Sequence, residues 1–471
     1  MCSERELMLS DEHEGIIELS RDAEVGCKYT DQANNLEISI DIAITPNRPD
    51  ALAIHGVARD LAARGIGKLR HIEAKKIAGK FESPIKVSLD KSVIADACPI
   101  FIGRYFRNVK NVQSPKWLQA KLVSIGLRPI SALVDITNFV TYDLGRPLHV
   151  FDADKLAGDL LIRQAKDNEK IIALDGLVYD LQRSDTVITC DGKVESIAGI
   201  IGGMNSGCSL ETKNVFLESA FFSSSSVAKT GRRLKINSDA RYRFERGVDP
   251  NFTEPGIEIA TRLVLDICGG EASEIVKEGT VPKPKEEIIF RPKRVKSLIG
   301  ISVPINRQKE ILTQLGFVTK KRDKDSYLVN VPSWRPDISG EADLIEEIVR
   351  VTSLSKLNGS PMVGLAAGAK APILTPAQKR LAVLRRRIAT FGLNECISYS
   401  FIDERSAEFF AAEKDVVKLL NPISSEMSHM RPSLLPGLCS AVKRNQARSF
   451  KNLKLFEIGE TFYGRRPGQQ R

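Results

Sequence analysis

The sequence is poor in the residues that most often bind metals or cross-link a chain. Histidine occurs 5 times in 471 residues, and aromatic residues make up 6% of the chain. A zinc site needs clustered Cys and His ligands, and a disulfide framework is typical of short secreted chains. No two of the eight cysteines form a CxxC pair, so neither is expected. We expect reduced thiols at Cys2, Cys27, Cys98, Cys190, Cys208, Cys268, Cys396 and Cys439.

Long hydrophobic runs are also missing. No stretch approaches the roughly 20 consecutive apolar residues that a membrane-spanning helix needs. The N-terminal sequence MCSERELMLSDEHEG is acidic and has no apolar signal-peptide core. Walker-type phosphate loops, GxSxG elbows and HExxH motifs are absent as well. These absences exclude several enzyme classes, and we expect a cytoplasmic protein without a membrane partner.

What the sequence does have is a modest excess of positive charge. Lys and Arg number 69 and Asp and Glu number 59, which gives a formal net charge of +10. Such an excess favours a polyanionic partner such as RNA. For a chain of this length it is equally consistent with plain solubility, so charge alone leaves both interpretations open.

Length and composition indicate several folded domains. The chain is 42% hydrophobic and 27% charged, and its length corresponds to about three domains. Strands and helices alternate without a strict βα rhythm, which predicts an α+β fold with mixed sheets. Strands are expected at Ile16–Leu19 and residues 36–44, followed by a helix that begins near Ala51. Further helices are expected at Pro115–Ile125, Asn251–Cys268 and Pro304–Leu315, and Gly359–Pro376 is expected to be a linker.

Six motifs in a fixed order carry a family resemblance. Together they resemble the beta subunit of bacterial phenylalanyl-tRNA synthetase, and they cover nearly the whole chain. The motifs are TPNRPDALAIHGVARDLAA, LVDITNFVTYDLGRPLHVFDADKL, SIAGIIGG, LESAFF, SDARYRFERGVDP and VPSWRPDISGEADLIEEIVRV.

The resemblance implies a multidomain assignment with a winged-helix-like module and a partial class II synthetase-like domain. It also implies a fragment, because most of the oligonucleotide fold and the C-terminal anticodon-binding domain are not found in the sequence. The assigned segments are the tail of the tRNA-binding oligonucleotide fold (1–30), a partial small α+β domain (36–78), the editing domains (85–285), the winged-helix-like domain (287–355) and the partial catalytic-like domain that contacts the alpha subunit (370–471).

An editing site is the first constellation that the resemblance implies. A hydrophobic pocket rejects an added hydroxyl only weakly, so a phenylalanine enzyme needs a second, hydrolytic site to remove tyrosine. The catalytic positions would be Arg128, Thr137, His149 and Glu218, with Glu218 accepting a hydrogen bond from the tyrosine hydroxyl. From the residues alone, a surface cation, a core histidine and a structural carboxylate are the favoured interpretations. The substrate-binding positions would be Pro147, Ser196, Ala198 and Gly199.

Four carboxylates form the second constellation. Asp343, Glu346 and Glu347 lie at i, i+3 and i+4 of a predicted helix, and Asp337 precedes them. The resemblance assigns these four residues to a Mg²⁺ site shared with the alpha subunit, and hard oxygen ligands suit that ion. The alternative is a solvated acidic face in which Glu346 pairs with Arg350.

The function implied is that of a synthetase subunit. It would hydrolyse mischarged tyrosyl-tRNA(Phe) and scaffold the alpha subunit, which would use ATP to attach phenylalanine to tRNA(Phe). The implied assembly is a heterotetramer of two alpha and two beta subunits. A free-standing aminoacyl-tRNA editing hydrolase and a non-catalytic RNA-binding or assembly protein remain the alternatives. The arginine-rich segment SDARYRFERGVDP is interpreted as a structural turn rather than an RNA contact.

Overall fold

The chain forms two compact units, Met1–Gly359 and Ser360–Arg471. The computed structural model describes residues 2–7, 13, 15–19, 21–29, 39–283, 285–357, 359, 373–411 and 416–464. None of the helices in these ranges is long and apolar enough to cross a membrane.

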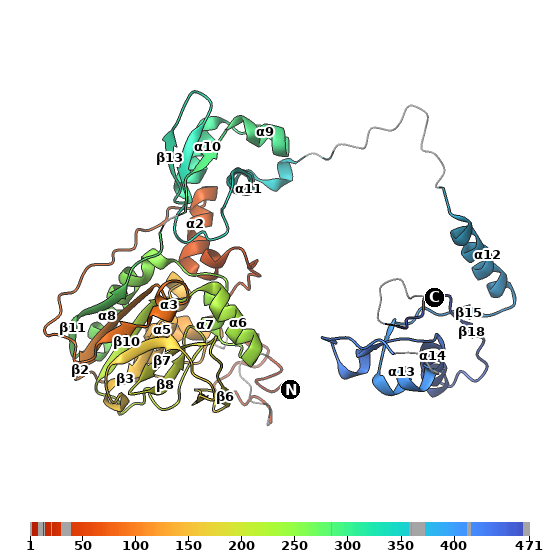
Figure 1. The fold of residues 1–471 in the computed structure, drawn as a ribbon, viewed down its shortest axis with the longest axis horizontal. Helices are drawn as coiled ribbons and strands as arrows, with labels where there is room; N and C mark the ends of the chain where they lie inside the picture. Colours follow the sequence, from red (N-terminus) through yellow and green to blue (C-terminus); the bar gives the residue numbers. More distant parts are fainter. Residues whose placement is uncertain are drawn as a thin grey trace. The chain divides into compact units, whose positions relative to one another are not determined.

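Two sheets form the centre of the first unit (Figure 1). Their strands are β1 (Val87–Leu89), β2 (Ile100–Arg107), β3 (His149–Asp152), β4 (Leu160–Gln164), β7 (Thr186–Cys190), β8 (Lys193–Ile197), β9 (Ile201–Gly202), β10 (Val215–Phe221) and β11 (Glu271–Gly279). One sheet has the antiparallel order β11-β2-β10-β3. The other has the order β1-β4-β7-β8-β9, in which only the β1–β4 pair is parallel. A separate antiparallel pair is formed by β5 (Lys170–Ile172) and β6 (Val178–Asp180).

Helices pack around these sheets. They are η1 (Pro49–Leu52), α2 (Ile54–Arg64), α3 (Lys91–Ile94), α4 (Lys116–Ser124), α5 (Ala132–Leu144), η2 (Ala153–Lys155), α6 (Ser224–Leu234), α7 (Asp239–Phe244), η3 (Pro250–Phe252) and α8 (Thr253–Cys268). The longest of them, α8, packs against α5 and against the four-stranded sheet. Its apolar residues, including Ile257 and Val264, are buried there, as the helical spacing of residues 251–268 predicts.

Alternate residues of β10 enter two different cores. Val215 and Leu217 pack with residues of α4, α5 and α8. Phe216 and Ala220 lie in a second core, which they share with residues of the five-stranded sheet such as Ile188. Because successive side chains of a strand point to opposite faces, β10 is buried on both sides. This explains why its sequence is almost continuously apolar.

The last part of the first unit has its own core. It contains β12 (Ile288–Phe290), α9 (Lys293–Ile299), α10 (Ile305–Gln314), β13 (Val318–Lys321), β14 (Tyr327–Asn330), α11 (Glu341–Thr352) and η4 (Leu354–Lys356). The three strands form an antiparallel sheet of order β12-β14-β13. Ala63 of α2 is buried in the same core, so the N-terminal helix is packed onto this region.

The second unit is less well packed. Its elements are α12 (Pro376–Thr390), β15 (Asn394–Glu395), β16 (Phe401–Ile402), α13 (Glu404–Phe410), η5 (Ser425–Met427), β17 (His429–Met430), α14 (Leu435–Ala447) and β18 (Leu455–Phe456). Within its described residues, the strands form only the two-stranded pairs β15–β18 and β16–β17. No residue of α12 is buried within the chain.

The mixed α+β architecture is confirmed, and the predicted helices near residues 115–125, 251–268 and 304–315 are present as α4, α8 and α10. The strands predicted at Ile16–Leu19 and residues 36–44 are wrong where the structure describes them, because 16–19 and 39–44 contain no strand. An isolated strand is unstable, and no described segment pairs with either of them. Residues 36–38 and most of the expected linker Gly359–Pro376 lie outside the described residues.

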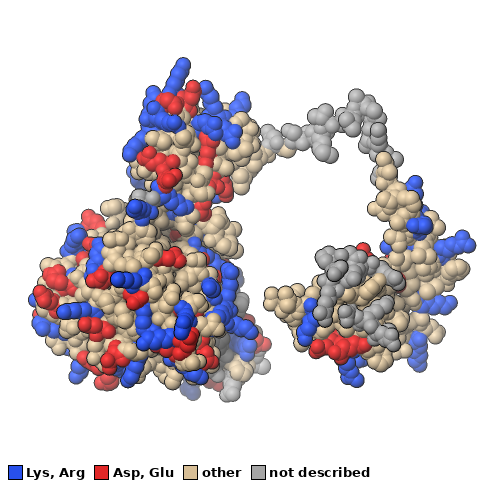
Figure 2. Space-filling view, in the orientation of Figure 1, with Lys and Arg blue, Asp and Glu red and all other residues tan. Residues whose placement is uncertain are grey.

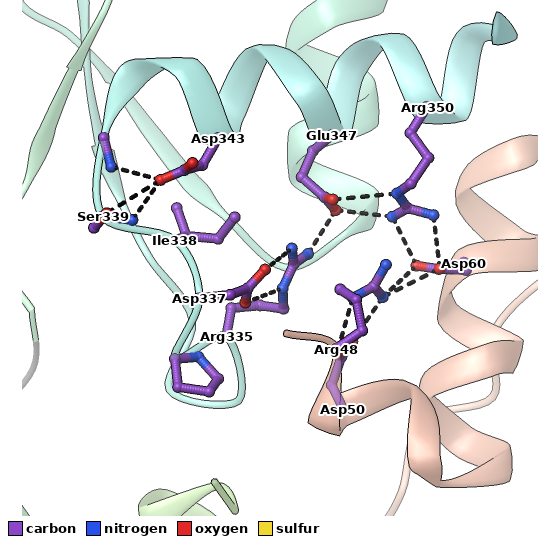
Figure 3. A network of polar contacts seen from close by, with 12 residues as sticks. Arg48, Asp50, Asp60, Arg335, Asp337, Ile338, Ser339, Asp343, Glu347 and Arg350 are labelled. Atoms are coloured by element: carbon purple, nitrogen blue, oxygen red, sulfur yellow. Dashed lines mark hydrogen bonds and ion pairs between the residues drawn. The ribbon is translucent and has the colours of Figure 1, made fainter. Parts of the chain in front are cut away.

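A chain of alternating charges joins the N-terminal helix region to α11 (Figure 3). Arg350 Nη1 donates to Asp60 Oδ2 at 2.8 Å, and Arg350 Nη2 donates to Glu347 Oε2 at the same distance. Arg335 Nη1 donates to the same oxygen of Glu347 at 2.5 Å, and its other nitrogens hold both oxygens of Asp337. Arg48 completes the chain by binding Asp50 and Asp60.

Glu347 is the most deeply buried acid of this network. Glu347 and Arg335 are each 2% exposed. Burial alone would raise the pKa of Glu347, but hydrogen bonds from Arg335 and Arg350 outweigh it and lower the pKa to about 2. The carboxylate therefore stays ionised at neutral pH and is held by two guanidinium groups.

Glu347→Gln is expected to destabilise the first unit by about 3 kcal/mol, because it removes one of the two carboxylates that bind buried Arg335. Thermal unfolding followed by circular dichroism at neutral pH measures the effect. The matched control is Glu346→Gln, an exposed neighbour on the same helix, which should change stability by less than about 0.5 kcal/mol. The ordinary pKa of 4.5 exceeds the folded value, so the gap should close as the pH falls from about 5 to about 2. A gap that persists at low pH would contradict the ionic account.

The same melting experiment distinguishes an arginine-bound cluster from a magnesium site. If Arg335 and Arg350 neutralise Glu347, EDTA should leave the unfolding midpoint of the unchanged protein where it is. A midpoint that drops with EDTA and returns with added Mg²⁺ would show that a cation holds these carboxylates instead.

Candidate functional site

His149 and Glu218 lie side by side on neighbouring strands. His149 opens β3, and β10 places Glu218 directly opposite it in the antiparallel register. Residues opposite each other in such a pair have Cβ atoms about 5 Å apart. Val150 and Leu217, the neighbouring residues on the two strands, face the helices. Because side chains alternate along a strand, His149 and Glu218 face the five-stranded sheet. The structure thus brings together two of the predicted catalytic residues.

Burial leaves both groups uncharged near neutral pH. It raises the pKa of Glu218 to about 8 and lowers the pKa of His149 to about 4. Glu218 Oε2 and His149 Nε2 are shielded from solvent and have no hydrogen-bond partner among the described residues. Buried polar atoms usually find partners, so an unpartnered pair suggests a site for a polar ligand. The site offers a neutral carboxyl group, which donates and accepts, and a neutral imidazole.

A glycine-containing turn forms the wall beside His149. A β carbon at Gly202 would lie 2.5 Å from His149 Cε1, so the bare backbone of β9 packs directly against the imidazole. Gly202 pairs with Ser196 of β8, whose hydroxyl donates to the Ile201 carbonyl at 3.2 Å. Gly199 adopts a left-handed φ of +68° in the connecting turn, which glycine does at little cost. Ser196, Gly199 and the buried Ala198 are therefore within the structure that supports His149.

The other predicted site residues lie elsewhere. Thr137 belongs to α5, which packs on the helix-covered face of the four-stranded sheet, and its hydroxyl donates to the Val134 carbonyl at 2.7 Å. Arg128 is exposed between α4 and α5 and forms no ion pair among the described residues. Pro147 is buried two residues before His149 and precedes β3. The structure gives these three residues no direct contact with Glu218.

One neighbour of the site has no signal in the sequence. Burial raises the pKa of the Cys98 thiol well above its ordinary value, and Glu218 adds to the increase. A cysteine in an otherwise ordinary apolar stretch gives no indication of such a position. Gly202, in contrast, belongs to a conspicuous run of glycines, SIAGIIGG.

The arginine-rich segment has structural partners. Arg243 donates to Asp239 at 2.9 Å and to the Leu52 carbonyl at 2.8 Å, and it lies over the Tyr142 ring. Arg241 donates to Glu245 at 3.0 Å. Residues Asp239–Phe244 of this segment form helix α7, so the predicted turn is wrong, although the arginines do have structural partners.

The four predicted magnesium ligands do not converge in the described residues. Asp343 accepts hydrogen bonds from the backbone nitrogens of Ser339 and Gly340 and so caps α11. Asp337 and Glu347 are bound by arginines, and Glu346 is exposed. No group of three or more His, Cys, Asp or Glu side chains is arranged to hold a metal ion anywhere in the described ranges. Donor groups already fill the positions that a cation would need, so this arrangement does not fit Mg²⁺. The expected pairing of Glu346 with Arg350 is also absent, because Arg350 binds Glu347 instead.

Three family models match successive parts of the chain. Residues 97–269 match the B3/4 domain. Residues 288–353 match the tRNA synthetase B5 domain, and residues 363–471 match the phenylalanyl tRNA synthetase beta chain CLM domain. His149 and Glu218 lie within the first match, and the arginine-bound carboxylates Asp337 and Glu347 lie within the second.

Curated relatives match the chain from end to end. A phenylalanine–tRNA ligase beta subunit from Cereibacter sphaeroides is 53% identical over 470 residues, which are 100% of this chain and 58% of that protein. The beta subunits from Ruegeria pomeroyi and Mesorhizobium japonicum are 54% and 49% identical, over 59% and 58% of their lengths. The chain thus spans somewhat more than half the length of the relatives that it matches.

A solved structure is also similar. It is an N-terminal fragment of the phenylalanyl-tRNA synthetase beta subunit from Pyrococcus horikoshii, with 16% identity and a TM-score of 0.35, and the match covers 66% of this chain and 85% of that one. The sequence identities and the three ordered domain matches carry the assignment without it. The chain belongs to the family of phenylalanine–tRNA ligase beta subunits and corresponds to a segment of them.

Proposed function

We propose that this chain supplies the editing and scaffolding parts of a phenylalanine–tRNA ligase. In this proposal it hydrolyses tyrosyl-tRNA(Phe) and holds an alpha subunit that attaches phenylalanine to tRNA. The observation that carries the proposal is the pair His149 and Glu218, two uncharged polar groups without partners in an otherwise apolar interior. Their position within the B3/4 match supports it.

Glu218 is proposed to recognise the tyrosine side chain. Tyrosine differs from phenylalanine by one hydroxyl, and an apolar pocket discriminates against such an addition by only about a hundredfold. A site that hydrogen-bonds the hydroxyl discriminates far better, because its polar groups stay unpaired when the hydroxyl is missing. Protonated Glu218 both donates to and accepts from a phenol, and phenylalanine offers neither interaction.

His149 is proposed to orient the attacking water. Hydrolysis adds water to the ester carbonyl carbon, breaks the ester bond to the terminal ribose and returns a proton to the ribose oxygen. Nε2 of neutral His149 has no partner among the described residues, and in the tautomer with the proton on Nδ1 it would accept a hydrogen bond from a water molecule. Ser196, Ala198 and Gly199 are proposed to form the wall of this site and Pro147 to position β3. Thr137 is proposed to support α5 beneath the site, and exposed Arg128 is proposed to contact tRNA phosphate.

The second unit is proposed to contact the alpha subunit. Large apolar side chains are exposed there, including Ile397, Leu420 and Ile423, each more than 90% exposed. So many exposed apolar side chains in one unit favour an assembled subunit over a free-standing hydrolase. The assembly is proposed to be a cytoplasmic heterotetramer of two alpha and two beta subunits acting on tRNA(Phe), with Mg²⁺ accompanying ATP in the alpha subunit. The winged-helix-like and class II-like descriptions of 287–355 and 370–471 belong to this proposal.

Glu218→Ala is expected to slow hydrolysis of tyrosyl-tRNA(Phe) by roughly ten- to a hundredfold. Removing Glu218 leaves the buried tyrosine hydroxyl unsatisfied, which costs about 1–3 kcal/mol and corresponds to about that factor. Release of labelled tyrosine by the alpha–beta assembly measures the rate. The matched control is Glu195→Ala, another buried glutamate of the same body that lies outside the pair. An unchanged rate in a folded Glu218→Ala assembly would refute the role of Glu218.

The pH profile of the same reaction should follow Glu218 rather than a histidine of ordinary pKa. His149 is neutral above about pH 4, so no inflection is expected near 6.5. Glu218 loses its proton near pH 8, and the ionised carboxylate accepts a stronger hydrogen bond. The preference for tyrosyl over phenylalanyl ester in kcat/KM should therefore rise above pH 8. The rise should be missing in Glu218→Gln, and an inflection near 6.5 would contradict a buried neutral His149.

The chain alone is not expected to activate phenylalanine. Adenylate formation needs reactants held in a rigid frame, and misplacement of about 1 Å costs about a hundredfold in rate. The described part of the second unit offers only two-residue strands in two separate pairs. Phenylalanine-driven ATP–pyrophosphate exchange with the purified chain should stay at background. Exchange above background that is lost in Arg431→Ala would place an active site in the second unit.

A further inference from the structure

Helix α6 presents three basic side chains without ionic partners. Lys229, Arg232 and Lys235 are exposed, and none of them forms an ion pair or side-chain hydrogen bond among the described residues. The fourth basic residue, Arg233, is paired with buried Asp185. The helix contains no acidic residue, so the positive charge of its outer face is not compensated locally.

Several basic residues of the first unit are paired with acids, whereas Lys229, Arg232 and Lys235 are not, within the described ranges. On the adjoining five-stranded region, Lys170 pairs with Asp180 at 3.0 Å and Arg183 pairs with Asp167 at 2.7 Å. On the β11 edge, Arg107 pairs with Glu271 at 2.8 Å. Lys and Arg are frequent over the part of the surface where α6 lies in Figure 1, as the space-filling view shows (Figure 2).

The two ends of α6 are fixed to the wall of the His149 site. At the start of the helix, Phe222 and Val227 pack against Gly199, where a β carbon would lie 2.9 and 3.1 Å from them. Just after its end, Ser238 donates a hydrogen bond to the Ile200 carbonyl. Gly199 and Ile200 belong to the turn that leads into β9, and β9 packs on His149 through Gly202. Helix α6 is therefore a charged element attached directly to this wall.

We infer that Lys229, Arg232 and Lys235 bind the phosphates of a single-stranded RNA 3′ end and lead its terminal ester toward His149 and Glu218. Lys229 and Arg232 lie three residues apart on the helix, about 4.5 Å along its axis, and Lys235 is the left-handed residue that follows its last turn. Three unpaired cations near a buried polar pair fit a polyanion whose terminus reaches that pair. This inference rests on the proposed editing function, and it adds the surface by which the substrate approaches.

The test is RNA binding by the full 471-residue chain. The probe is a fluorescein-labelled RNA hairpin with an unpaired 3′ end, followed by fluorescence anisotropy at several salt concentrations. The variant carries Lys229→Gln, Arg232→Gln and Lys235→Gln. Its affinity at low salt should fall at least tenfold. Each phosphate contact contributes about −0.7 to the slope of log K against log salt for single strands, so the slope should become shallower by about 2.

Two controls make the result specific. Lys110→Gln, Lys116→Gln and Lys121→Gln remove three exposed cations near α4, on the helix-covered side of the four-stranded sheet. This control should bind RNA as the unchanged chain does. A second α6 variant, with Lys229→Arg, Arg232→Lys and Lys235→Arg, keeps the charge and should keep the affinity. Loss of binding in the charge-keeping variant would show that the substitutions damage the fold and would remove the support for phosphate contacts.

The outcomes separate this inference from the editing proposal. Equal weakening by the α6 and α4 variants, or no weakening by either, overturns the α6 surface and leaves hydrolysis by His149 and Glu218 to be judged from the rates above. Glu218→Ala should bind the hairpin normally, because it removes no positive charge. Normal hydrolysis of tyrosyl-tRNA(Phe) by the assembled α6 variant at low RNA concentration would also overturn the inference.

Discussion

Burial of β10 on both faces is the constraint on which the rest of the first unit depends. The strand lies between β2 and β3, and its side chains alternate between the helix-covered core and the core shared with the five-stranded sheet. Any residue of β10 is therefore interior, whichever way it points. A carboxyl group at position 218 can only be accommodated in a neutral or paired state, because an isolated buried charge is too costly. The neutral state of Glu218 thus follows from the topology of the sheet.

The buried carboxylate in the last part of the first unit is ionised, in contrast to Glu218. Glu347 is as deeply buried as Glu218, but it has two guanidinium partners and remains ionised. Breaking such a pair is costly, although the pair itself adds little net stability. The value of the network lies in geometry: Arg350 holds an acid of α2 and an acid of α11 at once, which fixes the orientation of two segments far apart in the sequence.

Much of this architecture is predictable from sequence, and the failures have physical causes. Helices α4, α8 and α10 have apolar residues at helical spacing and were predicted. Helix α5 was not, because ALVDITNFVTYDL is rich in β-branched residues that favour strands, and only packing against α8 and α4 overrides that preference. The strand predicted at 39–44 is wrong for a different reason: alternation of apolar and polar residues does not make a strand without a pairing partner.

The candidate site was also predictable only in part. Register places Glu218 opposite His149, and no pattern within one strand reveals its partner. The family resemblance named both residues, but it also grouped four carboxylates as metal ligands. The sequence does not show that Arg335, which lies two residues before Asp337, folds back to bind both Asp337 and Glu347.

The position of Gly202 beside His149 limits the substitutions that it tolerates. Every amino acid that can replace glycine adds a β carbon, and at this position that atom meets the His149 ring at 2.5 Å. The position therefore has no conservative substitution: even the smallest missense change must shift the imidazole or the backbone of β9. The turn lies at the edge of its sheet, where a small shift is tolerated by the fold. A substitution at Gly202 would thus displace the imidazole of a residue that is proposed to act in catalysis.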